Sequence, residues 1–181
     1  CFAALPAFAG EVFKDDFESG LDQWTFTDAK AWQIADEDGD KVLELLGNSD
    51  YTPEVRSPVN IAWAKGVNVG SFEMTIRVKQ TGREYGHRDL CFFFGKQDDS
   101  RFYYVHLATK ADDHANSIFL VNGAPRVSIA TERTDGTTWD DAYHTVKIVR
   151  DVESGVIEVY FDNMEKPCMY TEDKTFTSGT I

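Results

Sequence analysis

The stretch that decides the fold runs from Tyr85 to Gly123 and reads YGHRDLCFFFGKQDDSRFYYVHLATKADDHANSIFLVNG. It contains three apolar runs, separated by short polar breaks: Leu90 to Gln97, Arg101 to Ala108 and Asn116 to Asn122. Runs this rich in aromatic and β-branched residues are typical of consecutive β-strands. The sequence therefore predicts an antiparallel meander at the centre of the chain.

A three-residue loop at Asp98 to Ser100 would set the register of this meander. Because side chains alternate along a strand, Tyr104 and His106 then share one face with three phenylalanines, Phe92, Phe94 and Phe102. We expect that face to turn toward a cleft, since it carries an imidazole and a phenol. The opposite face is more uniformly apolar and is the predicted core, with Cys91, Phe93, Tyr103, Val105 and Leu107.

Strand and turn patterns continue on both sides of the meander. Phe72 to Lys79 alternates between apolar and polar residues, which indicates a strand with one buried face. Ala31 to Ala35 and Lys41 to Leu46 flank an Asp-Gly turn and predict a hairpin. Further strands are predicted at Val127 to Thr131, Thr145 to Arg150 and Val156 to Asp162. Sustained helical spacing is absent from the sequence, so we expect an all-β domain of about ten to thirteen short strands, a β-sandwich of two antiparallel sheets.

Length and charge limit the classes of fold and partner. A chain of 181 residues is long enough for one domain that folds without a disulfide or a metal. The net charge of -13, from 18 Lys and Arg against 31 Asp and Glu, argues against nucleic acid or an anionic membrane surface as the partner. The sequence contains no run that approaches the roughly 20 apolar residues of a membrane span. Neutral ligands, cations and sugars remain.

The two ends of the chain predict processing and truncation. The first ten residues, CFAALPAFAG, resemble the tail of a secretory signal peptide, because the run is apolar and ends in small residues. We therefore expect a secreted or periplasmic protein with a single domain over residues 11–181; an ordinary first strand is the alternative. Ser178 to Ile181 resembles the start of another strand, so one or two further strands are expected to be missing from this sequence.

Cys91 and Cys168 are the only cysteines of the predicted domain. A free buried thiol is common for such residues, although a secreted chain also allows the two to pair. The sequence leaves both states open.

The N-terminal part of the domain carries a family resemblance. Phe13 to Leu21 reads FKDDFESGL and is followed by Trp24, Trp32 and an Asp-Gly turn. This pattern resembles the start of concanavalin A-like (laminin G-like) jelly-roll domains of secreted bacterial proteins, near the 3-keto-disaccharide hydrolase and family 16 glycoside hydrolase-like proteins. The resemblance extends through Phe72 to Lys79 and Asp151 to Asp162. It implies two curved antiparallel sheets, a concave face that accepts a glycan, and often a structural calcium ion.

The resemblance also bears on metal binding and on catalysis. It places the calcium ion at the N-terminal acidic turn, where Asp15, Asp16 and Glu18 offer the oxygen ligands that this cation prefers; a solvated acidic turn is the alternative. The family 16 catalytic pattern, Glu-x-Asp-x-x-Glu, does not occur in the sequence. The resemblance therefore does not extend to classical retaining glucanase chemistry.

Sugar binding needs flat aromatic surfaces for the pyranose rings and polar side chains for the hydroxyls. The meander and the loop around Trp139 contain both kinds, and Trp63 is a further aromatic candidate. We expect a glycan site lined by Tyr85, His87, Arg88, Asp89, Tyr104, His106, Asp112, His114, Asn116 and Trp139. Trp139 lies in a polar loop, where exposure and burial are both open, whereas Trp24 and Trp32 are expected to be core residues.

Three functional interpretations follow from these residues. The first is a non-catalytic module that binds a polysaccharide or oligosaccharide. The second is a glycan-cleaving hydrolase or lyase, whose candidate catalytic residues are His87, Arg88, Tyr104, His106 and His114, with Asp89, Asp112 and Asp113 as possible carboxylates. The third is a structural or adhesion sandwich with no small ligand. A transition metal on the histidines is a further alternative without a spacing signature.

Overall fold

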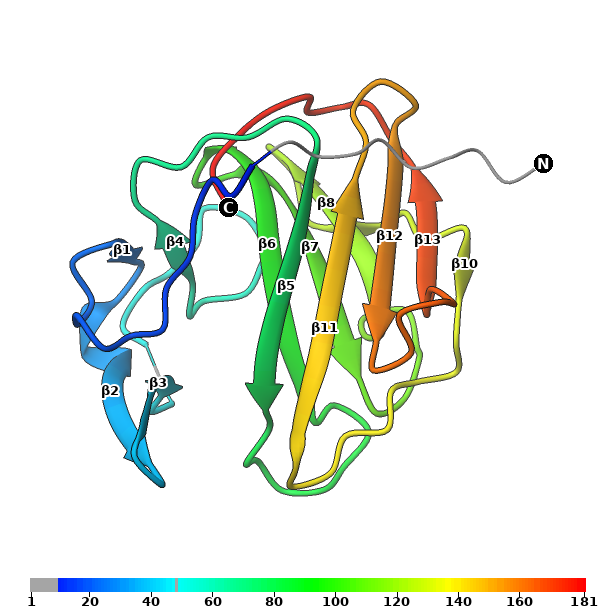
Figure 1. The fold of residues 1–181 in the computed structure, drawn as a ribbon. Helices are drawn as coiled ribbons and strands as arrows, with labels where there is room; N and C mark the ends of the chain where they lie inside the picture. Colours follow the sequence, from blue (N-terminus) through cyan, green and yellow to red (C-terminus); the bar gives the residue numbers. More distant parts are fainter. Residues whose placement is uncertain (1–9, 48) are drawn as a thin grey trace.

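The computed structural model describes residues 10–47 and 49–181, and these residues form an almost entirely β-stranded protein. Two antiparallel sheets pack face to face as a β-sandwich (Figure 1). The predicted all-β sandwich is therefore confirmed. The predicted signal-peptide remnant, apart from Gly10, lies outside the described residues. Within the described part, none of the helical structure has the length and apolarity that a membrane crossing requires.

The first sheet has five strands in the order β10-β13-β12-β11-β5. Their bounds are Phe72–Lys79 for β5, Glu132–Arg133 for β10, Tyr143–Arg150 for β11, Val156–Phe161 for β12 and Met169–Glu172 for β13. Every neighbouring pair is antiparallel. Alternation places the apolar set of each strand toward the second sheet, as the sequence pattern predicts for β5.

The second sheet has four strands in the order β6-β7-β8-β9. Their bounds are Asp89–Asp98 for β6, Arg101–Ala108 for β7, Ser117–Asn122 for β8 and Val127–Ser128 for β9. This sheet is the predicted meander, which is thereby confirmed. It lies behind the five-stranded sheet in the view of Figure 1.

Two smaller strand pairs stand beside the sandwich, at the left of Figure 1. β1 (Trp24–Phe26) pairs with β4 (Ala62–Ala64), and β2 (Trp32–Glu37) pairs with β3 (Asp40–Leu45), with a short 3-10 helix over Ala29–Ala31 before β2. Asp38 and Gly39 adopt φ angles of 57° and 93° in the β2–β3 turn, which confirms the predicted hairpin.

The main core fills the space between the two sheets. The buried residues of β6, β7 and β8 that contribute to it are Phe92, Phe94, Tyr103, Val105, Leu107 and Ile118, and those of β11, β12 and β13 are Val146, Ile148, Ile157, Val159, Phe161 and Met169. Cys168 packs at the margin of this core, and both Cys91 and Cys168 are free thiols. The alternative in which the two pair is therefore wrong.

The predicted register between β6 and β7 is wrong by one residue. Asp98 pairs with Arg101, so the connecting loop has two residues, and regular pairing resumes only at Phe94 opposite Tyr103. Gly95, with a φ of 66°, lies in the bulge between these pairs. The prediction therefore holds for β7, whereas in β6 Phe92 and Phe94 face the core, and Cys91 and Phe93 face outward.

A second apolar layer covers the outer face of the four-stranded sheet. Ile61 and Trp63, from the segment that includes β4, pack there against a group of buried side chains, Phe102, Tyr104, Phe119 and Val121. Val55, Cys91 and Phe93 lie at the margin of this cluster. The four-stranded sheet is consequently buried on both faces.

Candidate functional site

Most of the predicted site residues lie in three loops that meet at one end of the sandwich. These are the β5–β6 loop (80–88), the β7–β8 loop (109–116) and the β10–β11 loop (134–142). Backbone hydrogen bonds from Thr109 and Ala111 join the three loops to one another. A Cβ on Gly136 would lie 1.9 Å from the Thr109 carbonyl oxygen, so only glycine permits this approach.

Three of the predicted site residues are buried anchors of these loops. Arg88 donates to the Asp141 carboxylate (2.6 Å) and to a backbone carbonyl of the same loop. Asn116 donates to the Thr134 carbonyl oxygen (2.8 Å), and the Trp139 indole donates to a carbonyl of β7 (3.1 Å). Since all three side chains are buried, they hold the loops in place and are not available to a ligand. The exposure that the sequence allowed for Trp139 is not found.

Tyr104 and His106 do not face an open hollow, and that expectation is wrong. Tyr104 is 0% exposed and stacks on Phe119 with the ring centroids 5.0 Å apart. His106 is 6% exposed; its Nε2 lies 2.7 Å from Asp89 Oδ2, and its Nδ1 lies 3.0 Å from the His114 carbonyl oxygen. Burial raises the pKa of Tyr104. Tyr104 is covered because the segment bearing Ile61 and Trp63 buries its own apolar residues on this sheet face. His106 is enclosed by Asp89, Phe119 and the His114 backbone.

The remaining predicted residues form an accessible strip on the same loops. Tyr85 is 50% exposed and stacks with the His87 ring at 6.3 Å, while the Arg83 guanidinium lies 4.8 Å from the Tyr85 centroid. His87 Nε2 lies 2.7 Å from Asp112 Oδ2, and His114 is exposed. Backbone N–H donation from His114 and the contact with His87 lower the pKa of Asp112. We call Tyr85, His87, Asp112 and His114 the loop strip.

The five candidate catalytic residues do not share one cavity. His87 contacts Asp112, His106 contacts Asp89, and Arg88 contacts Asp141. Tyr104 is enclosed by aromatic rings. Among the described residues, no three His, Cys, Asp or Glu side chains are grouped so as to hold a metal ion.

The N-terminal motif closes a small aromatic cluster. Asp15 accepts from the Phe17 backbone N–H and from the Trp24 indole, each at 2.7 Å. The Trp24 ring also packs against Phe13 and Phe17, the two phenylalanines of the motif. Glu18 lies 3.5 Å from the Lys41 ammonium. The residues of the motif are therefore explained by packing around Trp24 and by the hydrogen bonds that Asp15 accepts. Calcium binding stays a prediction for the carboxylates of Asp15, Asp16 and Glu18.

An open groove of about 280 Å³ lies at the other end of the sandwich, where β6 ends. Four segments line it: β1, β4 with the turn that follows, the end of β6, and the C-terminal segment. The lining residues are Thr25, Trp63, Ala64, Lys65, Gly66, Lys96, Gln97 and Thr180. The buried Trp63 and Ala64 form its floor, while Thr25, Lys65 and Gln97 are exposed at its walls. We call this feature the Trp63 groove.

The bulge in β6 and the C-terminal segment together build the wall of the groove. Beyond Gly95, Lys96 pairs with Thr180 through two backbone hydrogen bonds of 3.1 and 3.2 Å. A Cβ on Gly179 would lie 2.3 Å from the Gly95 carbonyl carbon, so the two chains approach this closely only through glycine. Figure 1 shows the C-terminal segment crossing from β13 toward β4.

The groove presents hydrogen-bonding groups around an indole. The Lys96 ammonium lies 4.7 Å from the Trp63 ring centroid and 2.8 Å from Asp99 Oδ1. Gln97 donates through Nε2 to the Ser178 carbonyl oxygen (2.5 Å), which orients its amide toward the groove wall. Two threonines and Lys65 complete the polar lining. Sequence reasoning named Trp63 as an aromatic candidate but missed its polar neighbours, because they come from four separate segments.

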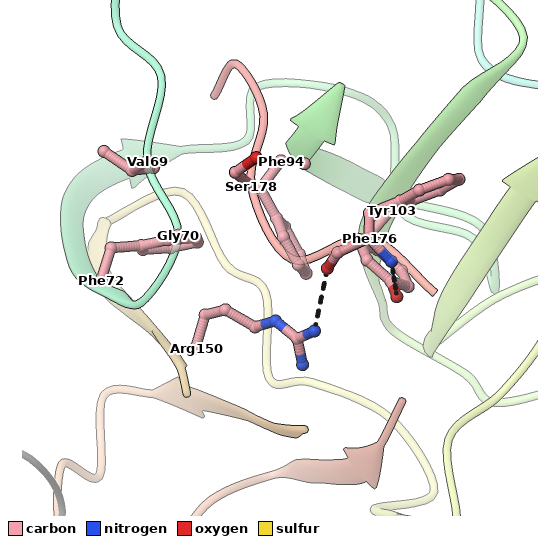
Figure 2. A pocket seen from close by; sticks show the side chains of 9 residues that line it. Val69, Gly70, Phe72, Phe94, Tyr103, Arg150, Phe176 and Ser178 are labelled. Carbon is pink, nitrogen blue, oxygen red and sulfur yellow. Dashed lines mark hydrogen bonds between the residues drawn. The ribbon is translucent and has the colours of Figure 1, made fainter. Parts of the chain in front are cut away.

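A second, much smaller cavity of about 10 Å³ lies inside the sandwich next to Arg150 (Figure 2). Arg150 donates to the carbonyl oxygens of Phe176 (3.1 Å) and Gly155 (2.5 Å). The Phe176 backbone N–H in turn donates to the Tyr103 hydroxyl (3.0 Å). Burial and the Asp173 carboxylate raise the pKa of Tyr103 to about 12. A space of this size holds at most one water, so this cavity is part of the packing and not a ligand site.

Comparisons with known proteins bear on the fold. The sequence matches no protein-family model and no curated protein. Among solved structures, the chain is similar to the carbohydrate binding module CBM66 from Bacillus subtilis, with a TM-score of 0.57 and 14% sequence identity over 87% of this chain and 84% of that chain. At this identity the likeness shows the fold, and it agrees with the β-sandwich described above.

Proposed function

We propose that this protein is a non-catalytic carbohydrate-binding domain and that the Trp63 groove holds the sugar. The observation that carries the proposal is the groove itself, which is open to solvent and carries hydroxyl, amide and ammonium groups around a floor formed by the buried Trp63 indole. The likeness of the fold to a carbohydrate binding module supports the same function. The loop strip is the alternative site, because its Tyr85 ring is 50% exposed even though His87 and Arg83 lie against it.

The size of the groove limits what it accepts. Its volume of about 280 Å³ lies just below the roughly 300–1,000 Å³ typical of small-molecule sites. This space suits one sugar ring, such as a chain end or a side branch of a polysaccharide, better than a long stretch of polymer. The exposed side chains of Gln97 and Thr25 would bind the hydroxyls of the ring.

The proposed setting is outside the cytoplasm, and this part of the proposal rests on the likeness of the first ten residues to the tail of a signal peptide. Kinship with the 3-keto-disaccharide hydrolase and family 16-like jelly-roll domains belongs to the same proposal. It rests on the N-terminal motif, which the structure explains as a packing unit around Trp24.

A glycan array followed by affinity electrophoresis tests the proposal. We expect binding to at least one glycan, weakened tenfold or more by Thr25→Val and Gln97→Ala, and unchanged by the matched control His87→Ala in the loop strip. Loss of binding in His87→Ala alone would move the site to the loop strip. Absence of binding to every glycan would reject the function. Reducing-end and unsaturated-product assays on each bound polymer should stay at background, and product release would favour the enzyme interpretation.

A further inference from the structure

We propose that the Trp63 groove selects an acidic sugar, whose carboxylate or sulfate group is held between Lys65 and Lys96. This inference rests on the proposed function and specifies its substrate class. The groove takes residues from four segments, and within the described part of the chain its only charged side chains are these two lysines. In a chain with 18 basic and 31 acidic residues, a cavity lined by two cations and no carboxylate runs against the overall composition.

The two ammonium groups are in different states. Lys65 is exposed and lies within 4.0 Å of no carboxylate among the described residues, so its charge faces solvent at the mouth of the groove. The Lys96 side chain is only 23% exposed and lies over the Trp63 ring, 4.7 Å from its centroid. Contact with an indole face holds a cation in a defined place. One lysine is therefore positioned and the other is free to close on an anion.

The present partner of Lys96 can be replaced. Asp99 lies 2.8 Å from the Lys96 ammonium, but its own side chain is 63% exposed and belongs to the short β6–β7 loop. Exposed ion pairs of this kind contribute little to stability. A carboxylate or sulfate in the groove would thus share the Lys96 ammonium with Asp99, or replace Asp99 there, at a small cost in free energy. The same anion would also pair with the Lys65 ammonium, which Asp99 does not contact in this structure.

The overall negative charge makes the inference testable, because it disfavours nonspecific binding of polyanions to the protein surface. A protein with a net charge of -13 repels polyanions over its surface as a whole. Binding of an acidic glycan therefore has to come from a local cationic site. Such binding should also weaken as salt rises, since the Debye length shortens to about 8 Å at 0.15 M ionic strength.

The experiment uses matched charged and neutral probes with the whole chain. Oligogalacturonate is compared with its methyl ester, and dextran sulfate with dextran, by calorimetry at 50 and 300 mM salt. We expect at least one charged member to bind tenfold or more tightly than its neutral partner, and to lose that advantage in Lys65→Gln and in Lys96→Gln. The pair that shows the preference identifies a carboxylate or a sulfate. Lys147→Gln is the matched control, since Lys147 lies on the outer face of the five-stranded sheet over Tyr160.

Three results would overturn the inference. Equal binding of charged and neutral members, or unchanged binding in both groove variants, would reject the acidic sugar but leave carbohydrate binding standing, provided that the glycan array shows a neutral ligand. An equal loss in Lys147→Gln would show nonspecific charge attraction. Absence of any glycan binding, on the array and with these probes, would reject the proposed function along with the inference. Circular dichroism of each variant confirms that the fold is intact.

Discussion

Arg150 offers a direct test of how the C-terminal segment is held on the sandwich. Its side chain is 1% exposed and donates to the carbonyl oxygens of Gly155 and Phe176, as Figure 2 shows for Phe176. Methionine keeps most of the apolar volume but leaves both carbonyls without this donor. A hydrogen bond from a charged group contributes roughly 1.5–3 kcal/mol, so two contribute about 3–6 kcal/mol. Desolvation, which lowers the pKa of Arg150, offsets part of this sum.

We therefore expect Arg150→Met to lower the free energy of unfolding by about 3 kcal/mol. For a chain of this length the melting temperature should fall by roughly 6–12 °C. Urea denaturation followed by tryptophan fluorescence measures the free energy, and hydrogen exchange should show early loss of protection in residues 173–181. The matched control is Arg77→Met, because Arg77 is exposed on β5 and its guanidinium lies 4.5 Å from the Tyr143 ring centroid; it should cost less than about 1 kcal/mol. If Arg150→Met is as stable as this control, the carbonyl contacts do not hold the segment.

Smaller tests address the β6–β7 turn, the core and the thiols. The Arg101 guanidinium beside Asp98 lowers the pKa of that carboxyl to about 2; Arg101→Ala should return it toward 3.8, as measured by NMR titration of the carboxyl carbon. Because the folded-state pKa is the lower one, the stabilisation is present above pH 4 and is lost as the pH falls toward 2. Trp139→Phe removes a buried donor to a β7 carbonyl and should cost roughly 1–3 kcal/mol in urea denaturation; no loss would contradict the anchoring role. Burial raises the pKa of the thiols of both Cys91 and Cys168, so iodoacetamide at pH 8 should label neither in the native protein and both in denaturant, as read by peptide mapping.

The regular strands could be predicted because each carries its own periodic signal. β5 alternates over its whole length, and the Asp38-Gly39 turn supplies the left-handed backbone that the β2–β3 hairpin needs. The alternation within β7 was also correct, with Tyr103 and Val105 in the core. These properties depend only on neighbours along one strand, and local sequence contains them.

The register of β6 against β7 was not predictable from alternation alone. A single glycine inside an apolar strand is a known signal of a bulge, and Gly95 is such a residue, but the pattern does not say how many residues the bulge displaces. The cover over Tyr104 was harder still. Ile61 and Trp63 lie in a segment with only a three-residue strand, so no periodicity indicated which surface they would bury. The histidines do lie near one another, through Asp112 and the His114 backbone, but His106 is buried and does not open onto a hollow.

The same bulge that broke the predicted register also explains where a ligand can bind. With both faces of the four-stranded sheet buried, its side chains are accessible only at the ends and edges. After Gly95 the pairing of β6 with β7 is interrupted until Asp98 lies opposite Arg101, and Lys96 pairs with Thr180. Lys96 and Gln97 line the groove together with residues of β4. In a regular strand Lys96 would lie on the same face as Phe94, toward the core, so the position of Lys96 over Trp63 depends on the bulge. Deleting one residue of the bulge should therefore abolish glycan binding while the core strands still form, and retained binding in that variant would separate the site from the groove.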